Sequence, residues 1–159
     1  MSRLVECVPN FSEGRDAAKV AAIVEAAKSA GATILDVETD ADHNRCVLSF
    51  VGAPEVCVEA CFRVARKAAE LIDLTVHKGE HPRMGAVDVI PFIPVAGVDI
   101  ADCVKLAEVL GERVGRELGI PVYLYDHAAR VPELKGLAKV RKGQFAGLRE
   151  LIRSDATLV

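Results

Sequence analysis

Residues 53–72 read APEVCVEACFRVARKAAELI, and this stretch anchors the predicted fold. Pro54 stands where proline is favoured, in the first turn of a helix. The apolar residues behind it recur every three or four positions and form one stripe: Cys57, Cys61, Val64, Ala65, Ala68 and Ile72. The charged residues fall on the other side: Glu55, Glu59, Arg63, Lys67 and Glu70. The stretch therefore predicts an amphipathic helix with a solvated charged face.

Upstream of this helix, three short segments rich in apolar and β-branched residues predict strands: 4–8, 32–38 and 45–52. A helix is expected between the first two, with Asp16 as its N-cap and Gly31 as its stop signal. The polar connection 39–44 is short enough to join the second and third strands as a hairpin. We read residues 10–15 as a polar turn that leads into the first helix.

Downstream, residues 87–95 predict a strand in which Pro91 and Pro94 favour an edge position or an irregular end. A third helix is expected to start at Asp99 or Asp102 and to end before Gly119. A short strand at 122–125 and a weaker helical pattern from 132 onward complete the chain.

The resulting order is β-α-β-β-α-β, followed by a helix, a strand and a helical tail. This order predicts an α+β fold, a ferredoxin-like βαββαβ sandwich with helices on one face of an antiparallel-rich sheet. With 159 residues and no linker or internal repeat, the chain is expected to form a single domain over 1–159.

Composition excludes several classes of protein. The net charge of −3 argues against a nucleic-acid-binding protein, because neutralising phosphates requires a concentrated basic face. No apolar run is long enough to cross a bilayer and no stretch reads as a signal peptide, so we expect no membrane association. The five cysteines are odd in number and lie in apolar patterns, which indicates reduced, buried thiols in a cytoplasmic protein.

Residues 77–86 read HKGEHPRMGA and concentrate ionisable groups on an irregular loop, which makes them a candidate site. A neutral His81 can accept and donate a proton near pH 7, and the flanking cations Lys78 and Arg83 suit a carboxylate substrate. A surface loop that happens to contain histidines is the alternative. The motif also matches the H-x-x-E-H zinc pattern, but glycine and proline oppose the helix which that pattern needs, so no metal is expected.

Two further polar clusters remain open to either function or turn chemistry. In residues 42–45, which read DHNR, Arg45 can clamp a carboxylate and Asn44 can bind an amide or heteroatom, with His43 beside them. Asp and Asn are equally typical of turns. In residues 10–14, NFSEG, backbone N–H groups at the start of a helix can meet an anion, or the segment can be a capping turn. We expect His127 to be structural.

Taken together, four stretches resemble the N-terminal subdomain of glutamate formiminotransferases: 4–14, 42–45, 77–94 and 121–125. The resemblance covers nearly the whole chain. It implies a cytoplasmic transferase of histidine catabolism and one-carbon metabolism with a ferredoxin-like fold. Such an enzyme transfers a formimino group from N-formimino-L-glutamate to N5 of tetrahydrofolate, its co-substrate. In the motif Gly-Glu-His-Pro-Arg, the resemblance implies that His81 is catalytic.

The chemistry calls for groups that bind anionic substrates, because the donor has two carboxylates and folate has an anionic tail. We expect this role of the following residues: Asn10, His43, Asn44, Arg45, Lys78 and Arg83. The family continues into a second subdomain beyond the point where this sequence ends, so we expect either a fragment of such an enzyme or a short relative that uses a complementary chain or a homo-oligomer. The alternative is a non-enzymatic, stand-alone subdomain that binds a ligand or a partner chain, and an exposed apolar face would favour the partner.

Overall fold

A computed structural model of the chain describes residues 3–72, 86–120, 122 and 124. The elements in chain order are β1 (Leu4–Cys7), β2 (Asn10–Phe11), α1 (Ala17–Ser29), β3 (Thr33–Asp40), β4 (Arg45–Gly52), α2 (Pro54–Leu71), β5 (Val87–Val89), β6 (Phe92–Ala96), α3 (Ile100–Arg113) and the π-helical turn η1 (Val114–Leu118). The predicted strand at 122–125, apart from residues 122 and 124, and the predicted helical tail lie outside the described residues.

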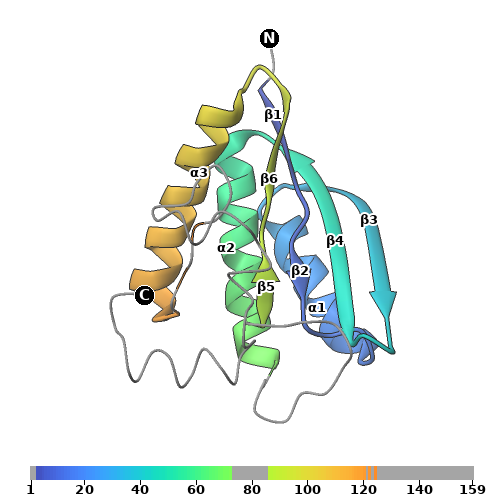
Figure 1. Cartoon of the computed structure of the whole chain (residues 1–159). Coiled ribbons are helices and arrows are strands. Elements are labelled where there is room, and N and C mark those ends of the chain that lie inside the picture. The colour runs from blue at the N-terminus through green and yellow to red at the C-terminus, as the bar shows by residue number, and fades with distance from the viewer. Residues whose placement is uncertain (1–2, 73–85, 121, 123, 125–159) are drawn as a thin grey trace.

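The strands form one antiparallel sheet in which β4 lies between β3 and the consecutive strands β1 and β2 (Figure 1). On the other side of that pair, β1 contacts β6 and β2 contacts β5. The α+β class is confirmed. The ferredoxin-like designation stays our interpretation of this strand order, and a single domain over 1–159 stays a prediction.

Two prolines divide what would otherwise be longer strands. Pro9 separates β1 from β2, and Pro91 separates β5 from β6, because proline has no N–H for the ladder. The carbonyls of both prolines still accept hydrogen bonds, Pro9 from Leu48 N at 3.0 Å and Pro91 from Val8 N at 3.4 Å. The predicted edge strand at 87–95 is therefore two strands, both at ends of the sheet order. Our reading of residues 10–15 as turn alone was wrong at its start, because β2 occupies 10–11 and pairs on both sides.

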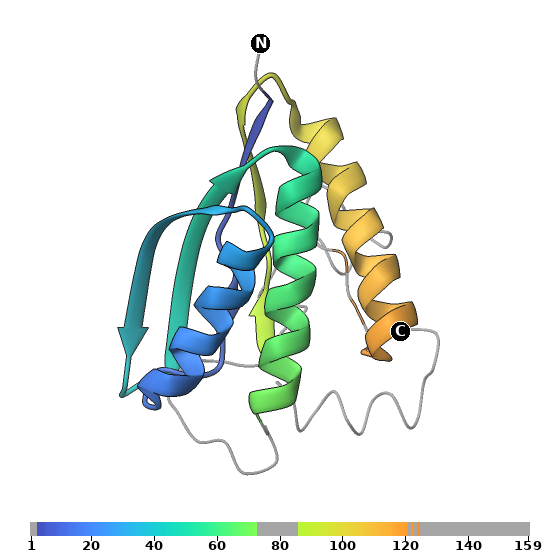
Figure 2. The same ribbon diagram turned by 180° about the vertical axis from the view of Figure 1, so that it is seen from behind.

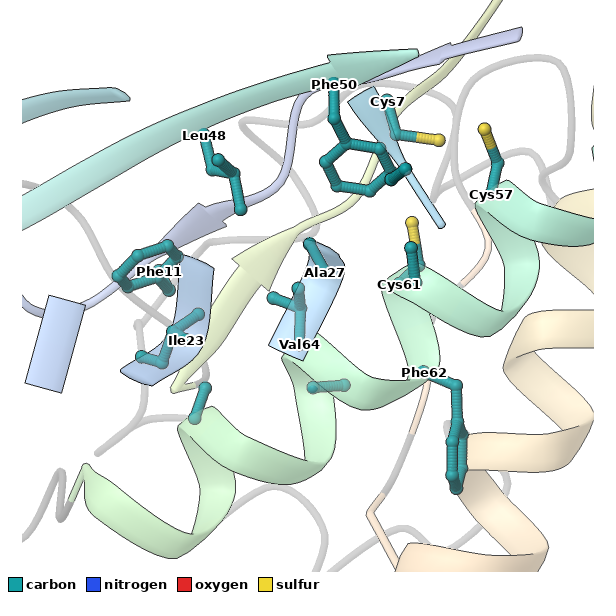
Figure 3. Packing of buried hydrophobic residues seen from close by; sticks show 14 of the residues in the cluster. Cys7, Phe11, Ile23, Ala27, Leu48, Phe50, Cys57, Cys61, Phe62 and Val64 are labelled. Carbon is teal, nitrogen blue, oxygen red and sulfur yellow. The ribbon is translucent and has the colours of Figure 1, made fainter. Parts of the chain in front are cut away.

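The three helices cover one face of the sheet, and Figure 2 shows them in front of it. Burial alternates along the strands accordingly: in β4, Cys46, Leu48 and Phe50 are fully buried and the residues between them are half-buried. Figure 3 shows Phe50 and Leu48 meeting Ile23 of α1 and Val64 of α2 in the core between the layers. The stripe predicted for residues 57–72 is this buried face of α2.

The helix boundaries follow the local signals in the sequence. Asp16 caps α1, its carboxylate accepting from the backbone N–H groups of residues 18 and 19 at 3.0 and 3.3 Å. Gly31 follows α1 with φ 97°, the left-handed conformation that glycine adopts at low cost. Asp99 and Asp102 both serve α3, because each side chain accepts from the other's backbone N–H in a capping box. None of the described helices is long and apolar enough to cross a membrane.

Candidate functional site

The structure describes four of the seven residues predicted to form the site. Asn10, His43, Asn44 and Arg45 are described, whereas the candidate base at position 81 and the cations at positions 78 and 83 lie outside the described residues. The same holds for the H-x-x-E-H pattern at 77–81 and for the histidine at 127. Among the described residues, no group of three or more His, Cys, Asp or Glu is arranged to hold a metal ion.

Asn10 and Arg45 lie on the same face of the sheet, away from the helices. Asn10 is paired with Val47, and Phe11 with Cys46, so Arg45 is the diagonal neighbour of Asn10 across the two strands. Because side chains alternate between faces, the burial of Phe11 and Cys46 under the helices places Asn10 and Arg45 on the other face. Diagonal neighbours on a sheet are about 7–8 Å apart at Cα, within reach of one small ligand.

Arg45 is half-buried at the start of β4. Among the described residues its guanidinium has neither an ion-pair partner nor a hydrogen-bond partner. Asn10 uses its side-chain N–H₂ group for a hydrogen bond to Val8 O at 3.0 Å. The pair therefore offers a guanidinium and an amide oxygen on one face of the sheet, and a guanidinium favours carboxylates as ligands.

His43 is held by a carboxylate in the turn between β3 and β4. Its Nδ1 lies 2.6 Å from Asp40 Oδ2, and both side chains are about two-fifths exposed. The other oxygen of Asp40 accepts from the backbone N–H groups of Asp42 and His43. The backbone N–H of His43, followed by its ring, lowers the pKa of Asp40. The imidazole is thus oriented by an ionised carboxylate, while its other nitrogen is available for contact.

Asn44 is placed differently, because it is only 7% exposed. Its Oδ1 accepts a hydrogen bond from the backbone N–H of Gly14 at 2.9 Å, 30 residues away in sequence. Its backbone has φ 51°, a left-handed conformation in which asparagine is tolerated better than most residues. Asn44 therefore joins the turn between β3 and β4 to the turn before α1.

The backbone N–H groups of the turn before α1 already donate hydrogen bonds within the protein. An anion site in this segment would need the same N–H groups. Glu13, 8% exposed, accepts from Arg15 N and Asp16 N at 3.1 and 3.2 Å and lies 3.8 Å from the Lys19 ammonium. The remaining donors of the turn are also paired: Ser12 N with Ala86 O, Glu13 N with Phe11 O, and Gly14 N with Asn44. With these donors engaged, the capping alternative fits the segment and the anion-binding alternative does not.

Glu13 and Gly14 are the residues here that sequence reasoning missed as structural elements. Both lie in the segment 10–14 that was considered as a site. The partner of Gly14, Asn44, is remote in sequence, and Glu13 accepts from the next turn of the chain. The available signal was the buried acid itself, because a carboxylate beside the start of a helix is a typical cap for free N–H groups.

Comparison with known proteins matches nearly the whole chain to one protein family. Residues 4–158 match the family described as formiminotransferase domain, N-terminal subdomain. The chain is 50% identical over 156 residues to a glutamate formimidoyltransferase of Streptococcus pyogenes, covering 98% of this chain and 52% of that protein. It is 51% identical over 155 residues to a glutamate formimidoyltransferase of Thermoplasma acidophilum, covering 96% and 51%.

A third relative is larger. The chain is 49% identical over 154 residues to the formimidoyltransferase-cyclodeaminase of Mus musculus, covering 96% of this chain and 28% of that protein. The chain thus spans about half the length of the two formimidoyltransferases that it matches. With the family match extending over nearly every residue, the chain belongs to the formiminotransferase family, in which it corresponds to the N-terminal subdomain.

Proposed function

We propose that this protein transfers a formimino group from N-formimino-L-glutamate to N5 of tetrahydrofolate, or forms the catalytic half of an enzyme that does so. The observation that carries the proposal is the identity of 50–51% with two glutamate formimidoyltransferases over nearly the whole chain. The placement of Arg45 and Asn10 on one face of the sheet supports it, because the donor substrate carries carboxylates.

The proposed reaction needs one group that exchanges protons with two amines. N5 of tetrahydrofolate attacks the formimino carbon, forming a C–N bond and a tetrahedral intermediate. His81 removes the proton from N5, and the imidazolium then protonates the amine nitrogen of glutamate as its C–N bond breaks. Glutamate leaves, the formimino group remains on N5, and the imidazole returns to its neutral form, so protons and electrons balance. A pKa near 6.5 suits an imidazole to both steps.

Ala86, the first described residue after the loop that carries His81, lies beside the end of β2. Ala86 O accepts from Ser12 N at 2.8 Å, directly after β2. His81 stands five residues before Ala86 in the sequence.

We assign substrate binding to residues of the sheet and its turn and to residues of the loop that carries His81. Arg45, Lys78 and Arg83 supply positive charge for the carboxylates of the donor and of the folate tail. Asn10 and His43 supply polar groups beside them, and Asn44 lies in the same turn as His43. Tetrahydrofolate enters as a co-substrate, and no metal is required for the step.

A complementary second-subdomain chain or a second copy is part of the proposal. In the edge strand β6, Ile93 is 40% exposed and Val95 is 53% exposed. The pairing of Ile93 with Glu6 places Ile93 on the sheet face away from the helices. Exposed apolar side chains favour burial against a partner. We also propose a cytoplasmic location, which the five free, buried cysteines support. A stand-alone module that only binds its partner is the alternative function.

Turnover of formiminoglutamate and tetrahydrofolate by the wild type and by His81→Ala tests the proposal. Loss of a general acid–base group is expected to lower kcat by about 10²–10⁴-fold. His127→Ala is the matched control, since that histidine is expected to be structural and has no assigned role in the reaction, so its removal should leave kcat of the folded protein within about twofold. Equal activity of wild type and His81→Ala would refute the role of His81. Absence of turnover in the presence of the second half of a relative would favour the binding module.

A further inference from the structure

We propose that Asn44 and Gly14 form a positioning pair which sets the backbone of Arg45 for binding the donor carboxylate. This inference rests on the proposed function, but it assigns Asn44 a role other than direct contact with substrate. In this assignment Arg45 touches the ligand, and Asn44 acts through it.

The first observation is the geometry of Asn44 itself. The residue is 7% exposed, and its Oδ1 is occupied by the N–H of Gly14 at 2.9 Å. A buried amide whose oxygen is bound to the protein has little free surface to offer a ligand. Its φ of 51° also fixes the direction in which the chain leaves the turn and enters β4 at Arg45. The backbone conformation of Asn44 therefore sets the position and direction of the Arg45 backbone at the start of β4.

The second observation is the close approach of Gly14 to that same backbone. A Cβ at position 14 would lie 2.5 Å from Arg45 O and 2.7 Å from Arg45 N, and closer still to Asp40 O. No real Cβ atom makes such contacts, so only glycine fits at this point. Gly14 thus packs its backbone against the first residue of β4 and the last residue of β3.

A third contact also joins the turn before α1 to the turn between β3 and β4. Arg15 Nε donates to Ala41 O at 2.7 Å, which joins the residue after Gly14 to the start of the turn. Two hydrogen bonds and one close contact therefore hold the turn before α1 against the turn between β3 and β4. Both turns lead directly to the proposed ligands, since β2 carries Asn10 and β4 carries Arg45.

Asn44→Gly is the sharpest test, because glycine retains the left-handed backbone and removes only the side chain. Asn44→Asp keeps an oxygen acceptor for the N–H of Gly14. Asp42→Gly places glycine in the same turn without touching the pair and is the matched control. The probes are N-formimino-L-glutamate and hydrogen exchange of the Gly14 amide, the second of which needs no catalysis.

A lost hydrogen bond corresponds to roughly a tenfold change in equilibrium. In Asn44→Gly, we expect about tenfold faster exchange at Gly14 and about a tenfold higher KM for the donor, with kcat changed by less than about threefold. Asn44→Asp should restore both the protection of Gly14 and the KM, and Asp42→Gly should change neither. Donor affinity measured by calorimetry is expected to follow KM.

Two results would overturn the assignment. Unchanged exchange at Gly14 in Asn44→Gly would show that the hydrogen bond does not hold the turn. Donor binding lost in Asn44→Asp while Gly14 stays protected would make Asn44 a direct ligand. Failure of the proposed function gives a different pattern, namely a wild type that neither binds the donor nor turns it over while Gly14 still responds to Asn44→Gly. Circular dichroism confirms that each variant is folded before these comparisons.

Discussion

The guanidinium carbon of Arg113 lies 3.8 Å from the centroid of the Phe62 ring, which joins α3 to α2. The same guanidinium donates to carboxylate oxygens of Glu59 and Glu117. Glu59 also accepts from Arg63 at 2.9 Å, and Arg63 reaches Ser29 at the end of α1 at 3.1 Å. One continuous set of polar and cation–π contacts thus connects the three helices on the side away from the sheet.

Arg113→Ala is expected to destabilise the protein by about 1–2 kcal/mol. A partly desolvated cation–π contact contributes about 1 kcal/mol or more, and each half-exposed ion pair contributes less than about 1 kcal/mol. Arg116→Ala, three residues along, is the matched control because Arg116 is 67% exposed and, within the described part of the chain, pairs with exposed glutamates. Its change should stay within about 0.5 kcal/mol. Urea unfolding measures both, and equal losses would contradict the special position of Arg113.

The stability of the fold should fall on acidification partly through Glu59. Hydrogen bonds from Arg113 and then Arg63 lower the pKa of this carboxyl from its ordinary 4.5. Since the pKa is lower in the folded state, the contribution is present above the unfolded pKa and is lost as the pH falls from about 4.5 through the folded value. The free energy of unfolding between pH 7 and pH 3 should therefore drop less in Glu59→Gln than in the wild type.

Glu112→Gln provides the control for this pH dependence. Its carboxylate is 73% exposed and, among the residues that the structure describes, pairs with Arg116, so its profile should run parallel to that of the wild type. A Glu59→Gln profile that also ran parallel would mean that the ion pairs of Glu59 are not maintained in solution.

The cysteines should be inert in the native protein. Burial raises the pKa of Cys46 to about 12 and raises that of Cys7 well above its ordinary value. The Cys57 thiol donates to Val5 O at 3.3 Å, and its contact with Cys7, followed by burial, raises its pKa as well. Figure 3 shows the sulfurs of Cys7, Cys57 and Cys61 directed towards one another in the core.

A disulfide reagent such as 5,5′-dithiobis(2-nitrobenzoate) measures this directly at pH 8. Because the thiolate is the reactive form, the native protein should react at least about 100-fold more slowly than the protein in urea. All five cysteines should titrate after unfolding. Rapid reaction of one thiol in the native protein would show that its side chain reaches solvent.

The cap of α1 should contribute measurably to stability. Asp16→Ala removes the acceptor for two backbone N–H groups and is expected to cost about 1 kcal/mol. Asp16→Ser retains a capping oxygen without the charge and should recover most of the loss. If Ser were as destabilising as Ala in thermal unfolding, the interaction would be one of charge with the helix dipole rather than a hydrogen bond.

Several features of this protein were determined by the sequence alone. Asp16, Pro54 and Asp99 mark helix starts, and the recurrence of apolar residues along 57–72 defines the buried face of α2. These features depend on neighbours within one or two turns of chain, so a local pattern is enough to specify them. Apart from β2 and the division of residues 87–95 into two strands, the order of strands and helices followed from the same signals, and with it the α+β class.

Only the tertiary structure decided which groups meet. Asn44 reads as a ligand in its own segment, yet its oxygen is taken by Gly14, 30 positions earlier. Arg113 of α3 contacts Glu59 of α2, 54 positions away, and no local pattern in the sequence indicates that contact. The two-residue strand β2 exists because strands on both sides pair with it, not because its sequence favours a strand. Such contacts depend on how elements pack together, and neither periodicity nor residue type along the chain contains that information.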